Sequence, residues 1–200
     1  MRRACAANLS YASRTDHDIR QCLNGSVEPT QSALIVPIPE AEPAVSGLRE
    51  RLDSAARWGI PAHITVLYPF LSPAQLTPAV LAAVRLVAAG VPRFFLSLDR
   101  IAWFTDRVLW LAPDPAEPFR ELTNRIATRF PQAQPYEGVF DEVVPHLTVG
   151  HDHPKADLDA AAEQVRPHLP IRARVTSLRL ITGLPQGAGS WHTVTDFPLG

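Results

Sequence analysis

The chain contains very little cysteine. Of its 200 residues only two are cysteines, Cys5 and Cys22, and both lie close to the amino terminus. Such a pair provides neither a disulfide framework nor a cysteine-based metal site for the rest of the chain. We therefore expect a protein of a reducing compartment, the cytoplasm.

The chain also lacks an excess of charge of either sign. Its net charge is −1 at pH 7 and its pI is near 6.6. A protein that coats long nucleic acid needs clustered Lys and Arg to neutralise phosphates. The balance argues against an extended nucleic-acid surface, and it is compatible with a small nucleotide or an RNA end as ligand.

Long hydrophobic runs are missing as well. No run approaches the roughly 20 apolar residues that a membrane-spanning helix needs. The first seven residues include two arginines but no hydrophobic region typical of a secretory signal. We expect neither a membrane segment nor a secretory signal.

What the sequence does contain is a short motif that occurs twice. Residues 61–66 are Pro-Ala-His-Ile-Thr-Val, and residues 145–149 are Pro-His-Leu-Thr-Val. With seven histidines and twenty-two serines or threonines in 200 residues, chance gives about 0.8 His-x-Ser/Thr tripeptides. Requiring apolar residues at the middle and following positions lowers this to roughly 0.16. A single histidine on a strand is usually just a surface residue, but two complete copies indicate a function.

The spacing within each motif predicts a strand with one polar and one apolar face. Side chains alternate along a strand, so His63 and Thr65 share one face, as do His146 and Thr148. The apolar residues between them face a core. Each copy therefore presents an imidazole and a hydroxyl whose Cα atoms are roughly 7 Å apart.

Two such pairs suit the cleavage of a phosphodiester. One histidine removes a proton from the attacking oxygen and the other delivers a proton to the leaving oxygen, each role giving typically about 10²- to 10⁴-fold. We expect the hydroxyls of Thr65 and Thr148 to hold the non-bridging oxygens. Neither motif contains a carboxylate, so backbone carbonyls or side chains elsewhere must set the histidine tautomers.

The remaining pattern predicts one domain over residues 31–200, preceded by a disordered tail over 1–30. Periodicity and turn residues predict strands and helices that alternate. The expected strands cover 32–39, 61–70, 94–104, 107–112, 144–149, 171–182 and 191–197, and the expected helices cover 43–56, 73–89, 116–130 and 156–165. Residues 105–106 are expected to form a two-residue hairpin turn.

The order of these elements recurs along the chain. The two motif histidines are 83 residues apart, close to half of the structured part. A solenoid would have a shorter period. The spacing therefore favours two similar lobes.

The two motifs and their context resemble the 2H phosphoesterase superfamily, and most closely its 2′-5′ RNA ligase-like and cyclic phosphodiesterase branches. The phrases Pro-Ala-His-Ile-Thr-Val-Leu-Tyr-Pro-Phe at 61–70 and Val-Pro-His-Leu-Thr-Val at 144–149 carry the resemblance. The element order extends it to residues 32–197. The tail is not covered.

The resemblance implies an α+β, bilobal fold in which two pseudo-symmetric antiparallel-sheet lobes with flanking helices form a central cleft. It implies catalysis by His63 and His146 and phosphate binding by Thr65 and Thr148, without metal or other cofactor. The substrates implied are 2′,3′-cyclic phosphate or 2′-5′ phosphodiester bonds of RNA ends or small nucleotides, as in RNA processing, with 2′-5′ RNA ligation as a further activity. We expect a monomer.

Three alternatives accompany this hypothesis. His151, Asp152 and His153 could bind a metal, but they lie where a strand gives way to a loop, and we expect no metal site. Tyr136, in a proline-rich loop, is the aromatic residue we expect to stack on a base. The chain could also be a non-catalytic module that recognises a phosphorylated nucleotide or RNA end, although such a module is expected to have lost a motif histidine.

Overall fold

A computed structural model describes residues 28–135, 143–185 and 190–200 of the chain. Most of the tail predicted over 1–30, and Tyr136, lie outside these residues. The strands are β1 (Gln31–Pro37), β2 (His63–Leu67), β3 (Phe94–Phe104), β4 (Val108–Asp114), β5 (Leu147–His151), β6 (Ile171–Val175), β7 (Ser177–Gly183) and β8 (His192–Pro198). The helices are α2 (Glu42–Leu52), α3 (Ser54–Arg57), α4 (Pro78–Ala89), α5 (Glu117–Arg129) and α6 (Lys155–Val165), with short 3₁₀ turns between elements.

The strands form two antiparallel sheets of four. The first has the order β2-β1-β7-β8 and the second the order β5-β4-β3-β6. Within the described part of the chain, each motif strand, β2 or β5, is therefore an edge strand that pairs with the strand before it in its own lobe. This is the α+β, bilobal arrangement that the sequence predicts.

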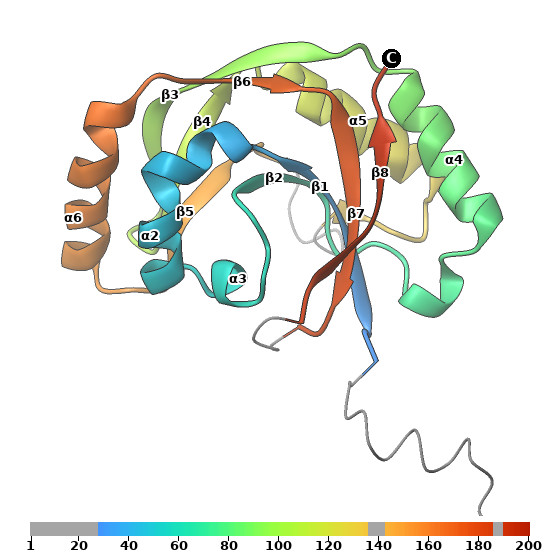
Figure 1. The fold of residues 1–200 in the computed structure, drawn as a ribbon, viewed down its shortest axis with the longest axis horizontal. Coiled ribbons are helices and arrows are strands. Elements are labelled where there is room, and N and C mark those ends of the chain that lie inside the picture. The colour runs from blue at the N-terminus through green and yellow to red at the C-terminus, as the bar shows by residue number, and fades with distance from the viewer. Residues whose placement is uncertain (1–27, 136–142, 186–189) are drawn as a thin grey trace, which may run out of the picture.

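Each lobe supplies a helix to the other lobe. Helix α2 connects β1 to β2 but packs against β5, and α5 connects β4 to β5 but packs against β2. The Thr123 hydroxyl on α5 donates to the Val66 carbonyl on β2 at 2.8 Å. In Figure 1, α2, α3 and α6 lie on one side of the molecule and α4 and α5 on the other. One continuous hydrophobic core spans both sheets.

A glycine lets two helices approach the second motif strand. Gly150 lies on β5, two residues after Thr148. A Cβ at this position would lie 2.6 Å from Leu158 Cδ2 and 3.1 Å from Leu52 Cβ, so α6 and α2 rest directly on the glycine backbone. This packing fixes the strand that carries the second motif.

Two predicted helices are interrupted. The helix predicted over 43–56 breaks at Asp53, which has an extended backbone and whose carboxylate accepts from Ala55 N at 3.0 Å, so that α3 starts anew. The helix predicted over 73–89 begins late, because Thr77 caps α4 by accepting from Val80 N at 3.3 Å. Polar capping side chains override the apolar periodicity in both places.

Two strand predictions are also corrected. The strand predicted over 171–182 is broken at Thr176 into β6 and β7, which belong to different sheets. This break carries the chain from the second sheet back to the first. The turn between β3 and β4 has three residues instead of two, since Phe104 pairs with Val108, and Thr105 adopts a left-handed φ of 52°.

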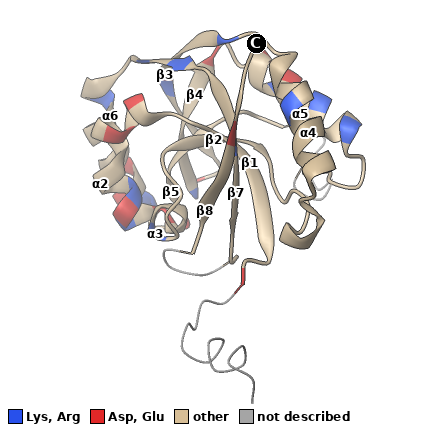
Figure 2. Ribbon diagram, turned by 45° about the vertical axis from the view of Figure 1, so that its right-hand side comes forward, with Lys and Arg blue, Asp and Glu red and all other residues tan. Residues whose placement is uncertain are grey.

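Charge is distributed away from the central strands. Figure 2 shows acidic and basic residues gathered on the helices and near β3, with few on the strands at the centre of the view. Both signs occur together on α2 and α6. None of the helices among the described residues has the length and hydrophobicity of a transmembrane span.

Candidate active site

A cavity lies where the two motif strands meet. It has a volume of about 550 Å³ and is lined by His63 and Thr65 from β2 and by Thr148 from β5. His146 precedes β5 directly, and its charge is close enough to lower the pKa of His63. The fold thus brings together the four residues that the two motifs single out.

The two histidines have the same tautomer for the same reason. His63 Nδ1 lies 2.8 Å from the Pro61 carbonyl, and His146 Nδ1 lies 2.7 Å from the Val144 carbonyl. A carbonyl only accepts a hydrogen bond, so Nδ1 must carry the proton in each ring. Nε2 of the neutral imidazole is left as a basic nitrogen, and Nε2–H of the imidazolium is left as an acid. The backbone sets the tautomers that the motifs could not explain.

The imidazole of His146 packs against two aromatic rings. The Phe104 ring meets it edge-to-face at a centroid distance of 4.9 Å, and the Trp110 ring lies at 5.8 Å. Trp110 is on β4, where it pairs with Thr148 of the motif strand. These rings hold the imidazole in place and remove water from one side of it.

Both histidines are shifted toward the neutral form. Burial lowers the pKa of His63 from its usual 6.5 to about 4, and the nearby Arg49 charge contributes to that lowering. Burial also lowers the pKa of His146, against the hydrogen bond to the Val144 carbonyl. A bound phosphate is an anion and acts in the opposite direction, because it stabilises an imidazolium. The site is therefore suited to gain a proton when an anionic ligand enters.

A buried ion pair lies behind His63. The Arg49 guanidinium, whose side chain is only 2% exposed, donates to Asp53 Oδ2 from Nε at 3.1 Å and from Nη2 at 3.0 Å. Asp53 also lines the cavity. Both charges act on the pKa of His63, Arg49 lowering it and Asp53 raising it.

The turn that leads into the first motif is held on two sides by α2. Arg49 Nη1 and Nη2 each donate to the Ile60 carbonyl at 3.3 Å, and Ala62 N donates to Glu42 Oε1 at 2.7 Å. The Pro61 carbonyl, which sets the tautomer of the first histidine, lies between these two anchors. Helix α2 therefore positions the imidazole through the backbone.

Sequence reasoning missed Arg49 and Asp53 as parts of the site. Their spacing of four residues on a helix was the available signal, since it permits an ion pair. Arg49 also lies beside Leu48 and Leu52 in helical projection, on the buried face of α2. A charged residue on an apolar face needs a partner, and Asp53 supplies it.

The residues considered for a metal are engaged in other contacts. Asp152 Oδ1 accepts from Arg107 Nε at 2.8 Å, and Asp152 Oδ2 lies 3.3 Å from His151 Nε2. The hydrogen bond from Arg107 is the main cause of a lowered pKa at Asp152. Across 28–135, 143–185 and 190–200, no group of three or more His, Cys, Asp or Glu side chains is placed to hold a metal ion. His151, Asp152 and His153 instead line the rim of the cavity.

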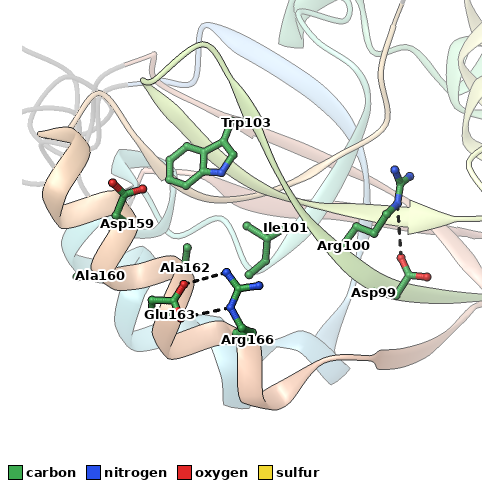
Figure 3. Close-up of a pocket in the computed structure, with 9 residues that line it drawn as sticks. All are labelled: Asp99, Arg100, Ile101, Trp103, Asp159, Ala160, Ala162, Glu163 and Arg166. Carbon is green, nitrogen blue, oxygen red and sulfur yellow. Dashed lines mark hydrogen bonds and ion pairs between the residues drawn. The ribbon is translucent and has the colours of Figure 1, made fainter.

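A second hollow, of about 650 Å³, lies between β3 and α6, away from the motifs (Figure 3). Its cations are paired with neighbouring acids. Arg166 Nη2 is 2.8 Å from Glu163 Oε1, and Arg100 Nε is 3.8 Å from Asp99 Oδ1. This hollow is the larger of the two, but it contains none of the motif residues, so the chemistry and not the volume identifies the candidate site.

The shifted histidine predicts a loss of stability in acid. A pKa of about 4 in the folded protein against 6.5 in the unfolded chain means that the unfolded chain binds this proton more readily. The stability contribution is complete above pH 6.5 and is lost as the pH falls toward 4. We expect urea unfolding to show a smaller difference between pH 7 and pH 4.5 in His63→Gln than in the wild type. An unchanged difference would show that His63 is not desolvated.

Two antiparallel sheets meet along the edge strands β2 and β5, and a histidine at or just before the start of each strand is fixed through Nδ1. This arrangement is that of the 2H phosphoesterase class. The model of the 2′-5′ RNA ligase superfamily matches residues 37–185. The chain belongs to this superfamily.

Similar proteins agree with this assignment. The chain is 26% identical over 170 residues to "Putative phosphoesterase GK0864" of Geobacillus kaustophilus, in an alignment that spans 84% of this chain and 94% of that protein. Among solved structures, Escherichia coli LigT complexed with 3′-AMP aligns with a TM-score of 0.54 and 19% identity, covering 86% of this chain and 99% of that one. TT0787 of Thermus thermophilus aligns with a TM-score of 0.58 and 18% identity, covering 84% and 97%. The solved structures support the fold.

Proposed function

We propose that this chain is a metal-independent phosphoesterase that acts on 2′,3′-cyclic phosphate or 2′-5′ phosphodiester bonds of RNA ends or small nucleotides. His63 and His146 are its acid–base pair, and Thr65 and Thr148 bind the phosphate. The observation that carries the proposal is that both imidazoles are fixed through Nδ1 to a backbone carbonyl, so that Nε2 is left for proton transfer in each. Relatives named as phosphoesterases support it, as do LigT structures complexed with 3′-AMP and with ATP.

Opening of a cyclic phosphate uses both imidazoles in one step. Nε2 of the neutral histidine takes a proton from water while the water oxygen bonds to phosphorus. Nε2–H of the protonated histidine passes its proton to a ribose oxygen while the bond from that oxygen to phosphorus breaks. When a 5′-hydroxyl attacks phosphorus in place of water and the bond from phosphorus to the 3′ oxygen breaks, the same two proton transfers make a 2′-5′ linkage. Ligation of RNA ends is therefore a further activity that we expect.

The two histidines are not electrostatically equivalent. The buried Arg49 charge acts on His63, where it favours the neutral form. His146 has aromatic neighbours instead. This difference favours His63 as the base and His146 as the acid in the hydrolytic direction.

The proposal is tested by incubating the protein with 2′,3′-cyclic AMP in the presence of EDTA and separating the products by chromatography. Conversion to adenosine 2′- or 3′-monophosphate is expected. In a parallel reaction, a 2′-5′-linked diadenosine phosphate tests the second bond type. Binding of either compound without conversion would identify a recognition module and overturn the proposed activity.

The motif threonines are expected to matter less than the histidines. A hydroxyl bonded to an anionic oxygen contributes about 1.5–3 kcal/mol, so Thr65→Ala or Thr148→Ala should lower kcat/KM roughly ten- to a hundred-fold. The serine variants keep the hydroxyl and should retain much of the activity. Thr193→Ala, at an exposed position on β8, is the matched control and should leave kcat/KM unchanged. Alanine variants as active as the wild type would remove the threonines from phosphate binding.

A further inference from the structure

The cavity has a second end that the proposed chemistry does not use. Beside the motif residues it is lined by Ala33, Ile35, Ile60, Ile181 and Trp191. These five residues form a buried hydrophobic cluster of their own, separate from the core that joins the two sheets. They cover the face of the first sheet that turns away from α4 and α5. The cavity is therefore polar at one end and apolar at the other.

The floor of the apolar end begins directly beside a motif threonine. Thr65 on β2 pairs with Ile35 on β1, and Ala33, two residues along β1, pairs with Ile181 on β7. Neighbouring strands are about 4.8 Å apart, so Ile181 lies two strand spacings, about 10 Å, from the Thr65 strand. That span fits a ribose and a base extending from a phosphate held at Thr65.

Three aromatic rings stand around this floor, from Trp58, Tyr68 and Trp191. The Tyr68 and Trp191 rings meet edge-to-face at a centroid distance of 6.1 Å. Trp191 N donates to the Trp58 carbonyl at 2.9 Å, which ties the two tryptophans together. Trp58 and Tyr68 are half-buried, so parts of their rings face the cavity.

The polar atoms of the Trp191 and Tyr68 rings are hydrogen-bonded to the protein. Trp191 Nε1 donates to the Leu184 carbonyl at 2.8 Å, and the Tyr68 hydroxyl donates to Gln31 Oε1 at 2.6 Å. A Cβ on Gly183 would lie 2.5 Å from Trp191 Cγ, so only glycine lets the indole lie against β7. Trp58 and Tyr68 therefore offer apolar ring surface to a ligand, with the buried Trp191 behind them, while the polar groups of Tyr68 and Trp191 are already bonded to the protein.

We propose that this aromatic subsite (Ile35, Trp58, Ile60, Tyr68, Ile181 and Trp191) binds the nucleobase of the substrate by stacking and apolar contact. The inference rests on the proposed function, since it takes the phosphate to lie at Thr65 and Thr148. Because the subsite presents ring surfaces, it accepts all four bases, and purines bind better than pyrimidines because they bury more apolar area.

The test compares a nucleotide with a base-free analogue of the same ester, 2′,3′-cyclic AMP with 1-O-methylribose 2′,3′-cyclic phosphate. Trp58→Ala removes a stacking ring and should raise KM for cyclic AMP by about five- to 150-fold. Turnover of the base-free ester should not change. Trp58→Phe keeps a ring and should restore most of the affinity. Trp103→Ala, on β3 beside the second hollow, is the matched control.

The outcomes separate the subsite from the catalytic proposal. An equal loss on both esters, or no loss on either, would overturn the subsite. Should the wild type turn over neither ester, the proposed activity fails, and calorimetry with 3′-AMP and ribose 3-phosphate then decides the subsite. Weaker binding of 3′-AMP to Trp58→Ala, with ribose phosphate binding unchanged, supports it, and equal binding of 3′-AMP to both proteins overturns it.

Discussion

Replacement of His63 by alanine is expected to lower kcat for a 2′,3′-cyclic nucleotide by about 10²- to 10⁴-fold, and replacement of His146 to do the same. Each variant removes one Nε2, and with it one of the two proton transfers. The double variant should lose little more than either single variant, because the two groups act in the same step. Steady-state rates on purified protein measure all three.

The control for these variants is His192→Ala on β8, where the histidine is exposed and outside the cavity. It should keep full activity. Circular dichroism of the His63 and His146 variants should match the wild type, since His63 lines the cavity and His146 is only partly buried, just before β5. Substantial turnover by either motif variant would remove that histidine from the mechanism.

Replacement of Asp53 by alanine is expected to destabilise the protein by about 3–5 kcal/mol, because it leaves the Arg49 charge buried without its partner. The Arg49 side chain is only 2% exposed, so water cannot replace the lost carboxylate. The same change removes the acceptor that caps α3. Urea unfolding at neutral pH measures the loss.

Two comparisons separate the buried pair from an ordinary surface pair. Asp152→Ala breaks the exposed pair with Arg107, which water screens, and should therefore cost much less stability than Asp53→Ala. The double variant Arg49→Met with Asp53→Ala removes both charges and should recover part of the stability. An Asp53→Ala protein as stable as Asp152→Ala would show that Arg49 is not held in a desolvated position.

The sequence was most informative in the two motifs, where side chains that alternate along a strand include the histidine and the threonine of the proposed chemistry. Alternation in each motif correctly predicts that His63 and Thr65 line a cavity while Ile64 and Val66 enter the core. The repeat also predicts two sheets, since equivalent strands carry equivalent motifs. These features depend on local spacing, and spacing is visible in a sequence.

Features that depend on contacts between distant segments could not be predicted in this way. Trp58 precedes the motif by only a few residues, yet it becomes part of the aromatic subsite through Trp191, which is far along the chain. The division of 171–182 into β6 and β7 is set by which sheet each half joins, not by its own composition. The burial of Arg49 depends on hydrogen bonds to the Asp53 carboxylate and the Ile60 carbonyl, and the second of these forms only in the folded protein.

The central claim is that two histidines, without a metal, carry both proton transfers. Its most direct test is kcat/KM for 2′,3′-cyclic AMP across pH, with and without EDTA. One imidazole must be neutral and the other protonated, so a bell-shaped profile is expected. Both pKa values are lowered in the free protein, and the pKa of His63 is about 4, so the optimum should lie below 6.5.

The limbs of that profile belong to the coupled pair and not to single residues. An anionic substrate raises the imidazole pKa values, so the optimum of kcat should lie at higher pH than that of kcat/KM. The account predicts the same profile in EDTA as without it. Activity that disappears in EDTA and returns with a divalent cation would contradict it, because the titrating group would then be a metal-bound water.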